Sequence, residues 1–199
     1  EIFGVKPPPE NQKAPGQIGV VAISSGEGLK AIFTSLGADK VVSGGQSMNP
    51  SVKEIAEAII EIPAEQIIIL PNNSNIRLSA VQAAELIEKE IMVVDTRSIP
   101  QGLAALLALN KTKTSGENHA EMCKRARQTK SGEITYAIRK AMVNNIRVEK
   151  GNIIGMSDGQ LLVSGKTVEE TTAALAGAIL TADDEVLTLF YGHEITNSQ

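Results

Sequence analysis

Residues 66–76 read QIIILPNNSNI, and the architecture of the chain can be worked out from this stretch. Its first five residues form a short apolar run, whose length and composition are typical of a strand buried on both faces. The next five residues, PNNSN, form turns readily and end that strand, and helical spacing of apolar residues begins at Ile76. A buried strand that leads straight into a helix is the repeating unit of parallel sheets.

The same alternation of strand and helix continues on both sides of this stretch. The predicted strands are 18–23, 40–43, 66–70 and 91–95, and the predicted helices are 28–36, 52–62, 76–88 and 101–109. This alternation predicts an α/β lobe with a parallel, doubly wound sheet that helices cover on both faces.

The pattern changes after Asn110, where the polar loop KTKTSGEN is followed by a helix and several short β-like runs. We therefore predict a parallel α/β lobe at 16–115 and a smaller, β-rich α+β lobe with one or two helices at 116–199. The elements predicted for this second lobe are a helix at 117–128, strands at 133–139, 145–149, 153–156 and 160–164, a helix from Thr167 and a strand at 186–191.

The first 15 residues contain prolines at positions 7, 8, 9 and 15 and offer little apolar surface to bury. We interpret residues 1–15 as an extended linker. The chain also lacks an initiator methionine, so we expect it to be a fragment of a longer protein.

The composition excludes several classes of protein. The chain has 199 residues and a formal net charge of −4, so no strong positive field favours nucleic acid. Aromatic residues make up only 3%, which disfavours stacking on bases. A single cysteine excludes an internal disulfide and fits the reducing cytoplasm. No apolar run approaches the roughly 20 residues that a membrane-spanning helix needs.

In an open parallel sheet, ligands bind beyond the carboxyl ends of the strands. The loops predicted there hold mainly amides, hydroxyls and glycines, which offer hydrogen-bond donors and acceptors but little fixed charge. The candidate residues for binding a ligand or a partner are Ser25, Glu27, Gly45, Gln46, Asn49, Asn72 and Asn73. The same residue types also form ordinary turns and helix caps, so a purely structural role stays open. We expect the asparagines mostly to brace the loops and Gln46 to be freer.

Motifs for nucleotides, metals and catalysis are missing from the sequence. No glycine loop is followed by a lysine with the spacing that cradles phosphates. His119 and His193 have no neighbouring His or Cys at a metal-ligand spacing, and Cys123 lies in a helical pattern. We therefore predict no catalytic residue and no metal site. A basic cluster is interpreted as a solvated helix face, with a docking patch as the alternative, and its members are Lys124, Arg125, Arg127 and Lys130.

Eight short motifs follow one another along the chain. They are SSGEGL (24–29), SLGAD (35–39), GGQSMNPS (44–51), LPNNSNI (70–76), TRSIPQGLAALLA (96–108), GEITYAIR (132–139), IIGMSDGQLL (153–162) and LTLFYG (187–192). Together they resemble the C-terminal region of the ATP-binding subunit of bacterial fatty acid kinase, a family also described as dihydroxyacetone-kinase-like or as Dak phosphatase. The resemblance covers about Gly16 to Glu194. Lys140 and His193 stand where that family's pattern favours acidic residues.

This resemblance implies a division of labour. In that family an N-terminal domain binds ATP and magnesium, and the C-terminal region engages a separate carrier protein. The fatty acid on the carrier is then phosphorylated on its carboxylate to an acyl phosphate. This chain is therefore expected to be the carrier-docking region beside other domains of its parent chain, with no cofactor of its own and no catalysis alone.

Two alternatives stay open at this point. The chain could instead be a dihydroxyacetone-kinase-like domain that binds a small polar ligand at the strand-end loops. The histidine that holds substrate in dihydroxyacetone kinase has no match here, so that chemistry is not carried over. If the strand-end loops are not the docking surface, the next candidate is the second lobe around Arg139, Arg147 and Tyr191.

Overall fold

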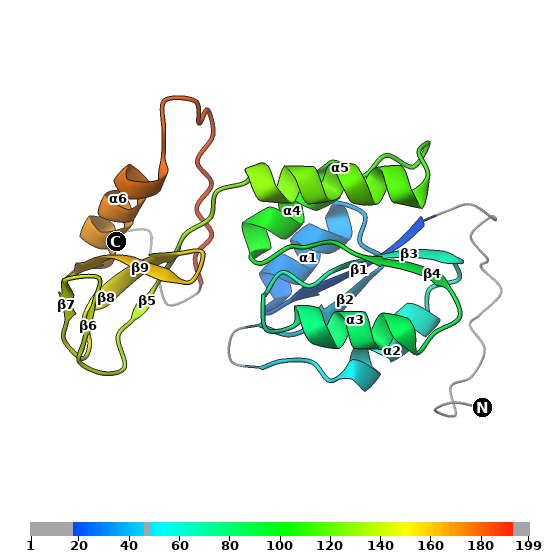
Figure 1. The fold of residues 1–199 in the computed structure, drawn as a ribbon, viewed down its shortest axis with the longest axis horizontal. Helices are drawn as coiled ribbons and strands as arrows, with labels where there is room; N and C mark the ends of the chain where they lie inside the picture. Colours follow the sequence, from blue (N-terminus) through cyan, green and yellow to red (C-terminus); the bar gives the residue numbers. More distant parts are fainter. Residues whose placement is uncertain (1–17, 46–47, 193–199) are drawn as a thin grey trace. The chain divides into compact units, whose positions relative to one another are not determined.

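The computed structural model describes residues 18–45 and 48–192, and the chain divides into two units between Thr129 and Lys130 (Figure 1). We call the part up to Thr129 unit 1 and the part from Lys130 unit 2. The linker predicted at 1–15 lies outside the described residues.

Unit 1 is built on a four-stranded parallel sheet with the order β2-β1-β3-β4. Its strands are β1 (Ile18–Ser24), β2 (Lys40–Ser43), β3 (Gln66–Leu70) and β4 (Glu90–Val93). The chain runs outward from β1 to β2 and then crosses back to β3 on the other side of β1. The direction of winding therefore reverses between β1 and β3, which is the place where sheets of this kind open a crevice.

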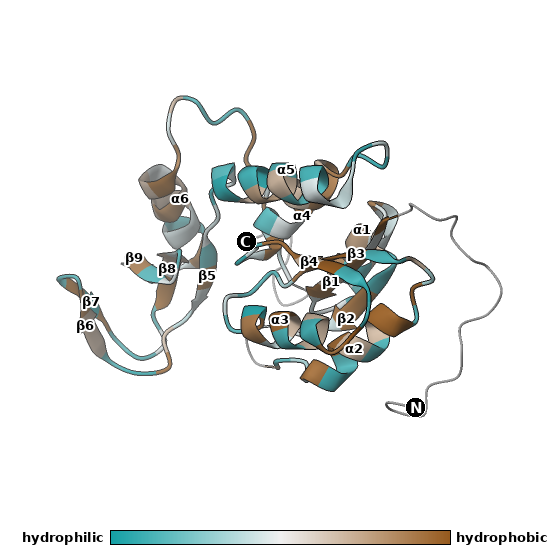
Figure 2. Cartoon of the chain, turned by 45° about the vertical axis from the view of Figure 1, so that its right-hand side comes forward, coloured by the Kyte–Doolittle hydropathy of each residue, from teal (hydrophilic) through white to brown (hydrophobic). Residues whose placement is uncertain are grey.

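Helices cover both faces of this sheet, as the sequence predicts. They are α1 (Glu27–Ser35), α2 (Val52–Ile60), α3 (Arg77–Glu85), α4 (Ile99–Leu107) and α5 (Ser115–Gln128). Val20 and Ala22 of β1 point to the face under α1, α4 and α5, whereas Val21 and Ile23 point to the face under α2 and α3. The two central strands are hydrophobic on both faces for this reason, and they appear brown in Figure 2.

Helix α5 belongs to unit 1, which moves the boundary from the predicted position. The sequence places the boundary near residue 115 and assigns this helix to the second lobe, but α5 packs against α4, β3 and β4. Its Met122 and Ala126 are fully buried in the core under α4. Ser115, at the start of α5, also donates a hydrogen bond to Glu90 of β4, which lowers the pKa of Glu90. The division therefore falls after α5.

Unit 2 is a small antiparallel structure with one covering helix. A three-stranded sheet has the order β5-β8-β9, and a separate hairpin pairs β6 with β7. These elements are β5 (Glu133–Tyr136), β6 (Ala141–Val143), β7 (Ile146–Val148), β8 (Ile153–Ser157), β9 (Gln160–Gly165) and α6 (Val168–Ile179). Asn144 and Asn145 join β6 to β7 with φ angles of 48° and 63°, the left-handed conformation that two-residue hairpin turns require. The fold is thus α/β with a parallel, doubly wound first unit and a smaller β-rich second unit, as predicted.

The strand predicted at 186–191 is wrong. These residues have no regular secondary structure, and Val186 and Tyr191 are 81% and 66% exposed. An extended segment becomes a strand only when its backbone pairs with a neighbour, and this segment has no strand pairing in the described part of the chain. The strand β6, by contrast, was not predicted.

The described residues include no helix that is long and apolar enough to cross a membrane.

Candidate functional site

Asn72 fills the end of the sheet between β1 and β3. It lies directly beyond β3 in the left-handed conformation, with a φ of 57°, and only 5% of it is exposed. Its side-chain Nδ2 donates to the carbonyl oxygen of Ile23 at 3.0 Å, and its backbone N–H donates to Oγ1 of Thr96 at 3.0 Å. Asn72 therefore ties the ends of β1 and β3 to the segment after β4, which is the bracing role that we expected of it.

The first turn of α4 presses against the same amide. A Cβ added to Gly102 would lie 2.0 Å from Oδ1 of Asn72, so only glycine fits at this position. Within the described residues, Asn72 Oδ1 and Ser24 Oγ are buried and make no hydrogen bond. The crevice between β1 and β3 is thus closed by the protein's own side chains, and a ligand would have to displace Asn72 to enter it.

The other candidate residues in the strand-end loops differ from one another in their contacts and exposure. Asn73 braces its own loop, since its Oδ1 accepts a hydrogen bond from the backbone N–H of Asn75 at 2.8 Å. Ser25 and Asn49 are exposed. Gln46 lies outside the described residues, so its expected freedom stays a prediction.

Two more predicted residues lie near the start of α1. Glu27 is exposed in the first turn of that helix and forms an ion pair with Lys30 at 3.6 Å. A Cβ on Gly45 would lie 3.0 Å from Ser25 Oγ, so Gly45 allows the second loop to approach the first closely. The binding role of these residues stays a proposal.

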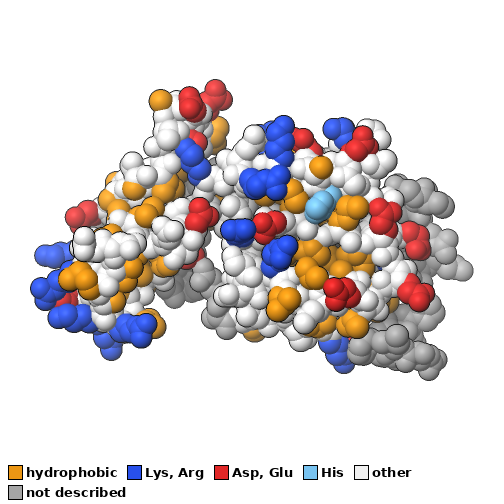
Figure 3. Space-filling view, viewed as in Figure 1, with side chains coloured by type: hydrophobic (Ala, Val, Ile, Leu, Met, Phe, Trp, Pro, Cys, Tyr) orange, Lys and Arg blue, Asp and Glu red, His pale blue; other side chains and the backbone are white. Residues whose placement is uncertain are grey.

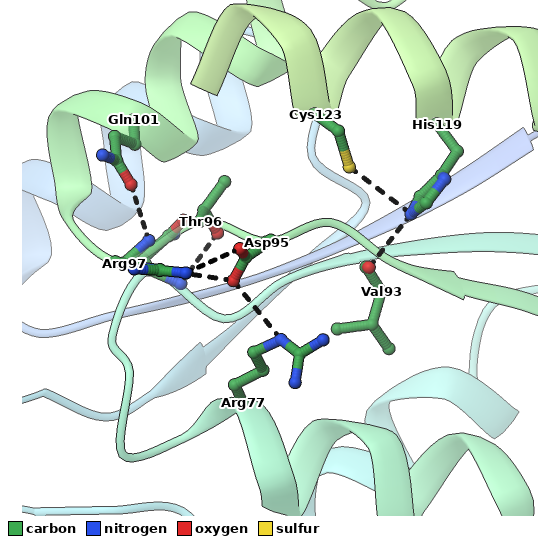
Figure 4. A network of polar contacts seen from close by, with 9 residues as sticks. Arg77, Val93, Asp95, Thr96, Arg97, Gln101, His119 and Cys123 are labelled. Carbon is green, nitrogen blue, oxygen red and sulfur yellow. Dashed lines mark hydrogen bonds and ion pairs between the residues drawn. The ribbon is translucent and has the colours of Figure 1, made fainter. Parts of the chain in front are cut away.

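An open pocket of about 410 Å³ lies instead at the carboxyl ends of β3 and β4, and it is lined by Ser74, Arg77, Asp95 and Arg97. Asp95 lies between the two arginines (Figure 4). Its Oδ1 is 3.3 Å from Nε of Arg77, and its Oδ2 is 3.0 Å from Nη2 of Arg97. Asp95 is the last residue of the strand predicted at 91–95, but neither it nor the two arginines was among the candidate residues, although each arginine stands beside a strand-end loop.

His119 and Cys123 form a close pair on α5, but their geometry does not suit a reactive thiol. Nε2 of His119 lies 3.5 Å from Cys123 Sγ and 3.1 Å from the carbonyl oxygen of Val93 (Figure 4). A carbonyl oxygen only accepts hydrogen bonds, so that nitrogen carries a hydrogen and cannot take the proton of the thiol. Cys123 is also buried. We interpret the pair as part of the packing between α5 and β4.

Metal ligands do not gather in the described part of the chain: no three His, Cys, Asp or Glu side chains there are placed to hold an ion.

The hairpin β6–β7 and its flanks present an unusual surface in unit 2. Three apolar side chains are exposed on it: Ile138 by 84%, Met142 by 68% and Val143 by 39%. Four cations occur in the same segment, Arg139, Lys140, Arg147 and Lys150, and Arg147 lies opposite Met142 in the hairpin. Figure 3 shows basic side chains gathered around this end of unit 2. We call Ile138, Met142, Val143 and the four cations the hairpin surface.

One acid lies among these cations. Glu149 forms ion pairs with Arg147 at 2.8 Å and with Lys140 at 3.4 Å. The hydrogen bond from Arg147 contributes most to lowering the pKa of Glu149. The hairpin surface therefore keeps a clear excess of positive charge, although the whole chain is negative.

Comparison with known proteins identifies relatives along nearly the whole chain. A family model for the C-terminal region of FakA-like fatty acid kinase proteins matches residues 19–199. The Bacillus subtilis protein YloV is 33% identical over 194 residues, which cover 96% of this chain and 35% of YloV. Two proteins named as uncharacterized, from Staphylococcus haemolyticus and Staphylococcus aureus, are 38% and 37% identical over 175 residues, which cover 88% of this chain and 32% of theirs. The chain thus spans about a third of the length of these curated relatives.

Proposed function

Because the chain belongs to the FakA-like fatty acid kinase family, as the C-terminal region of such proteins, we propose that it docks a separate protein that carries a fatty acid. The kinase transfers the γ-phosphoryl group of ATP to a carboxylate oxygen of that fatty acid, which yields an acyl phosphate and ADP. ATP and magnesium bind to another region of the parent protein. This chain supplies recognition of the carrier, and it acts in the cytoplasm.

The hairpin surface is the feature that most supports docking of a protein. Apolar side chains as exposed as Ile138 and Met142 cost solvation in water, and a protein partner relieves that cost when it covers them. Cations beside an exposed apolar side chain, such as Arg147 opposite Met142, also match the usual anatomy of an interface, in which charged groups form the rim. The partner that fits has an apolar centre with acidic residues around it, because opposite charges steer the encounter and fix its register.

The test is a titration of this chain with the fatty-acid-loaded carrier protein of the same cell, followed by calorimetry. We expect Met142→Glu to weaken docking at least about tenfold, because a charge replaces an apolar contact and is repelled by the partner's acids. Leu78→Glu is the matched control, since Leu78 on α3 is 67% exposed and Met142 is 68% exposed. This control should bind within about twofold of the unmodified chain.

Two results would reject the proposal at different levels. Equal affinity of the unmodified chain, Met142→Glu and Leu78→Glu would reject the hairpin surface as the docking surface. No binding of the unmodified chain to the loaded carrier would reject docking by this region altogether.

A small polar ligand at the strand ends is the second candidate function. The pocket beside Asp95 favours it, because it is open and lies where parallel sheets bind ligands. The packed surroundings of Asn72 oppose it at the crevice between β1 and β3. A ligand at the strand ends is therefore best sought beside β4.

A further inference from the structure

The segment 183–190, which follows α6 in unit 2, is exposed along its whole length although most of it is apolar. It reads DDEVLTLF, and we call it the acidic–apolar segment. Val186 is 81% exposed, Leu187 53% and Leu189 62%. Soluble proteins rarely leave several adjoining large apolar side chains in water unless a partner covers them. The docking of a carrier on the hairpin surface does not explain this second exposed apolar region.

Two of the three acids at the start of this segment are free. Asp184 is engaged, since Nζ of Lys130 lies 2.6 Å from its Oδ2 and the backbone N–H of Thr181 donates to the same oxygen at 2.7 Å. The side chains of Asp183 and Glu185 are exposed, and neither forms a hydrogen bond or an ion pair with another described residue. The segment therefore begins at a tied turn and presents two unpaired negative charges beside its apolar residues.

Two cations of the hairpin surface are unpaired in the same sense. The side chains of Arg139 and Lys150 form no hydrogen bond or ion pair within the described part of the chain, whereas the other two cations share Glu149. Lys150 directly precedes Gly151, whose backbone N–H donates to the carbonyl oxygen of Ala137 at 2.8 Å. Arg139 and Lys150 thus stand on the two flanks of the hairpin, which this hydrogen bond holds together.

Strand β6 supplies a free backbone edge between these flanks. The hairpin is a sheet of two strands, so β6 pairs with β7 on one side only. Strand β7 also packs against β9 and its Val148 is 3% exposed, whereas Met142 and Val143 of β6 are 68% and 39% exposed. Strand β6 is therefore the outer strand, and the N–H and C=O groups on its free edge can pair with a further strand. A hairpin of two strands is only marginally stable alone, so a third strand would stabilise it.

The acidic–apolar segment has the composition that fits this edge. In an extended backbone every second side chain points to the same side, so Glu185, Leu187 and Leu189 share one side. An acid and two leucines then meet cations and the exposed apolar side chains of β6. Within one chain the segment and the hairpin surface are both exposed, and Figure 1 shows them apart in unit 2. The occupant that the structure offers is therefore the segment of a second copy.

We propose that the acidic–apolar segment of one copy binds along β6 of a second copy, with Asp183 and Glu185 facing Arg139 and Lys150. The contact joins two different surfaces of the same chain, so it is heterologous. A single added strand covers less area than a standard interface, and we expect a dissociation constant of about 100 μM. Self-association goes beyond the proposed function, because no carrier takes part in it. A carrier that docks on the hairpin surface competes with it.

The test is sedimentation of the 199-residue chain between about 5 and 500 μM at low ionic strength. The mean mass should rise with concentration, and about 0.5 M salt should weaken the association at least about threefold, because it screens exposed charges. Leu187→Lys is repelled by the cations of the hairpin and Met142→Glu by the acids of the segment, so each should weaken it at least about fivefold. The matched controls are Leu86→Lys and Leu78→Glu on the surface of unit 1, where these leucines are 53% and 67% exposed. Both controls should associate within about twofold of the unmodified chain.

A mixture of the two defective variants tests the heterologous contact itself. Leu187→Lys keeps an intact hairpin and Met142→Glu keeps an intact segment, so the mixture should associate at least about threefold more strongly than either variant alone. A thermal unfolding midpoint measured for each variant checks that it folds.

Three results would each overturn the proposal. They are an unmodified chain that stays monomeric at about 500 μM, equal weakening by Leu187→Lys and Leu86→Lys, and a mixture that associates no better than its components. None of these measurements uses the carrier, so their outcome is independent of the docking experiment.

Discussion

Unit 1 and unit 2 cover their sheets in different ways. The parallel sheet of unit 1 has helices on both faces, and its central residues, such as Ile68 and Leu70, are completely buried. The antiparallel sheet of unit 2 packs against one helix, α6, and against strand β7 of the hairpin, and Leu161 in its core is 8% exposed. Unit 1 is therefore tightly packed, whereas unit 2 leaves more of its apolar side chains exposed to solvent.

Replacing one helical glycine in each unit with alanine should give the largest difference between the units in the free energy of unfolding. In unit 1, Gly102→Ala would place a Cβ within 2.0–2.8 Å of the whole Asn72 amide, which must then move and break its bond to Ile23. We expect it to lower the free energy of unfolding by about 3 kcal/mol. In unit 2, Gly177 of α6 has open space around it, so Gly177→Ala should raise that free energy by about 0.5–1 kcal/mol.

Urea denaturation of both variants measures these changes. A cost below about 1 kcal/mol for Gly102→Ala would show that the packing between α4 and Asn72 is not tight.

Removal of an amide side chain at a strand end should give the next largest loss of folding free energy. Asn72→Ala should cost about 2 kcal/mol of folding free energy, because the carbonyl oxygen of buried Ile23 loses its hydrogen bond. Asn49→Ala, at an exposed position of a neighbouring loop, should cost less than about 0.5 kcal/mol. Chemical denaturation monitored by circular dichroism compares the two variants. Equal costs would contradict the distinction between the braced residues and the surface residues of these loops.

The smallest expected effect on stability comes from an ion pair in unit 2. Nζ of Lys130 lies 2.6 Å from Oδ2 of Asp184, and the backbone N–H of Thr181 donates to the same oxygen at 2.7 Å. The hydrogen bond from Lys130 is the main cause that lowers the pKa of Asp184 from 3.8 to about 2. A lowered acid pKa stabilises the fold above the unfolded value, and that contribution disappears as the pH falls from 3.8 toward 2.

Carboxyl NMR titration of the unmodified chain and of Lys130→Ala measures this pKa. The variant should raise the pKa of Asp184 toward its ordinary value, and the control Lys124→Ala on α5 should leave it unchanged. An Asp184 pKa that stays near 2 in Lys130→Ala would assign the shift to Thr181 instead.

The sequence predicted the strands of unit 1 closely, and physical reasons explain why. Gln66–Leu70 matches the prediction residue for residue, because a strand buried on both faces leaves an unbroken apolar run between polar turns. Lys40–Ser43 also matches the prediction, although none of its residues is fully buried. The short hairpin strands of unit 2 leave a much weaker pattern. The apolar run at 186–191 was predicted as a strand for the same reason that succeeded in unit 1, but composition does not reveal whether a pairing edge exists.

The candidate site also has some features that could be predicted from the sequence and others that could not. The bracing role of Asn72 could be predicted, since an asparagine just beyond a strand readily adopts a left-handed conformation and bonds to backbone. The pair formed by Arg77 and Asp95 could not, because the two residues follow different strands, and only the adjacency of β3 and β4 brings them together. The exposure of Ile138 and Met142 could not be predicted either, since an apolar side chain in a β-like run is typical of a core position.

The class of the fold, the family and the approximate bounds of the strands in unit 1 could thus all be predicted from the order of the residues. The fold class and the strand bounds depend on local composition and on periodic burial, which neighbouring residues encode together, whereas the family was predicted from the resemblance of the eight motifs. Three further features required the folded chain: α5 completes unit 1, Asn72 closes the central crevice, and two arginines meet at Asp95. They depend on contacts between residues far apart in the chain, which the order of the strands sets and no local pattern records.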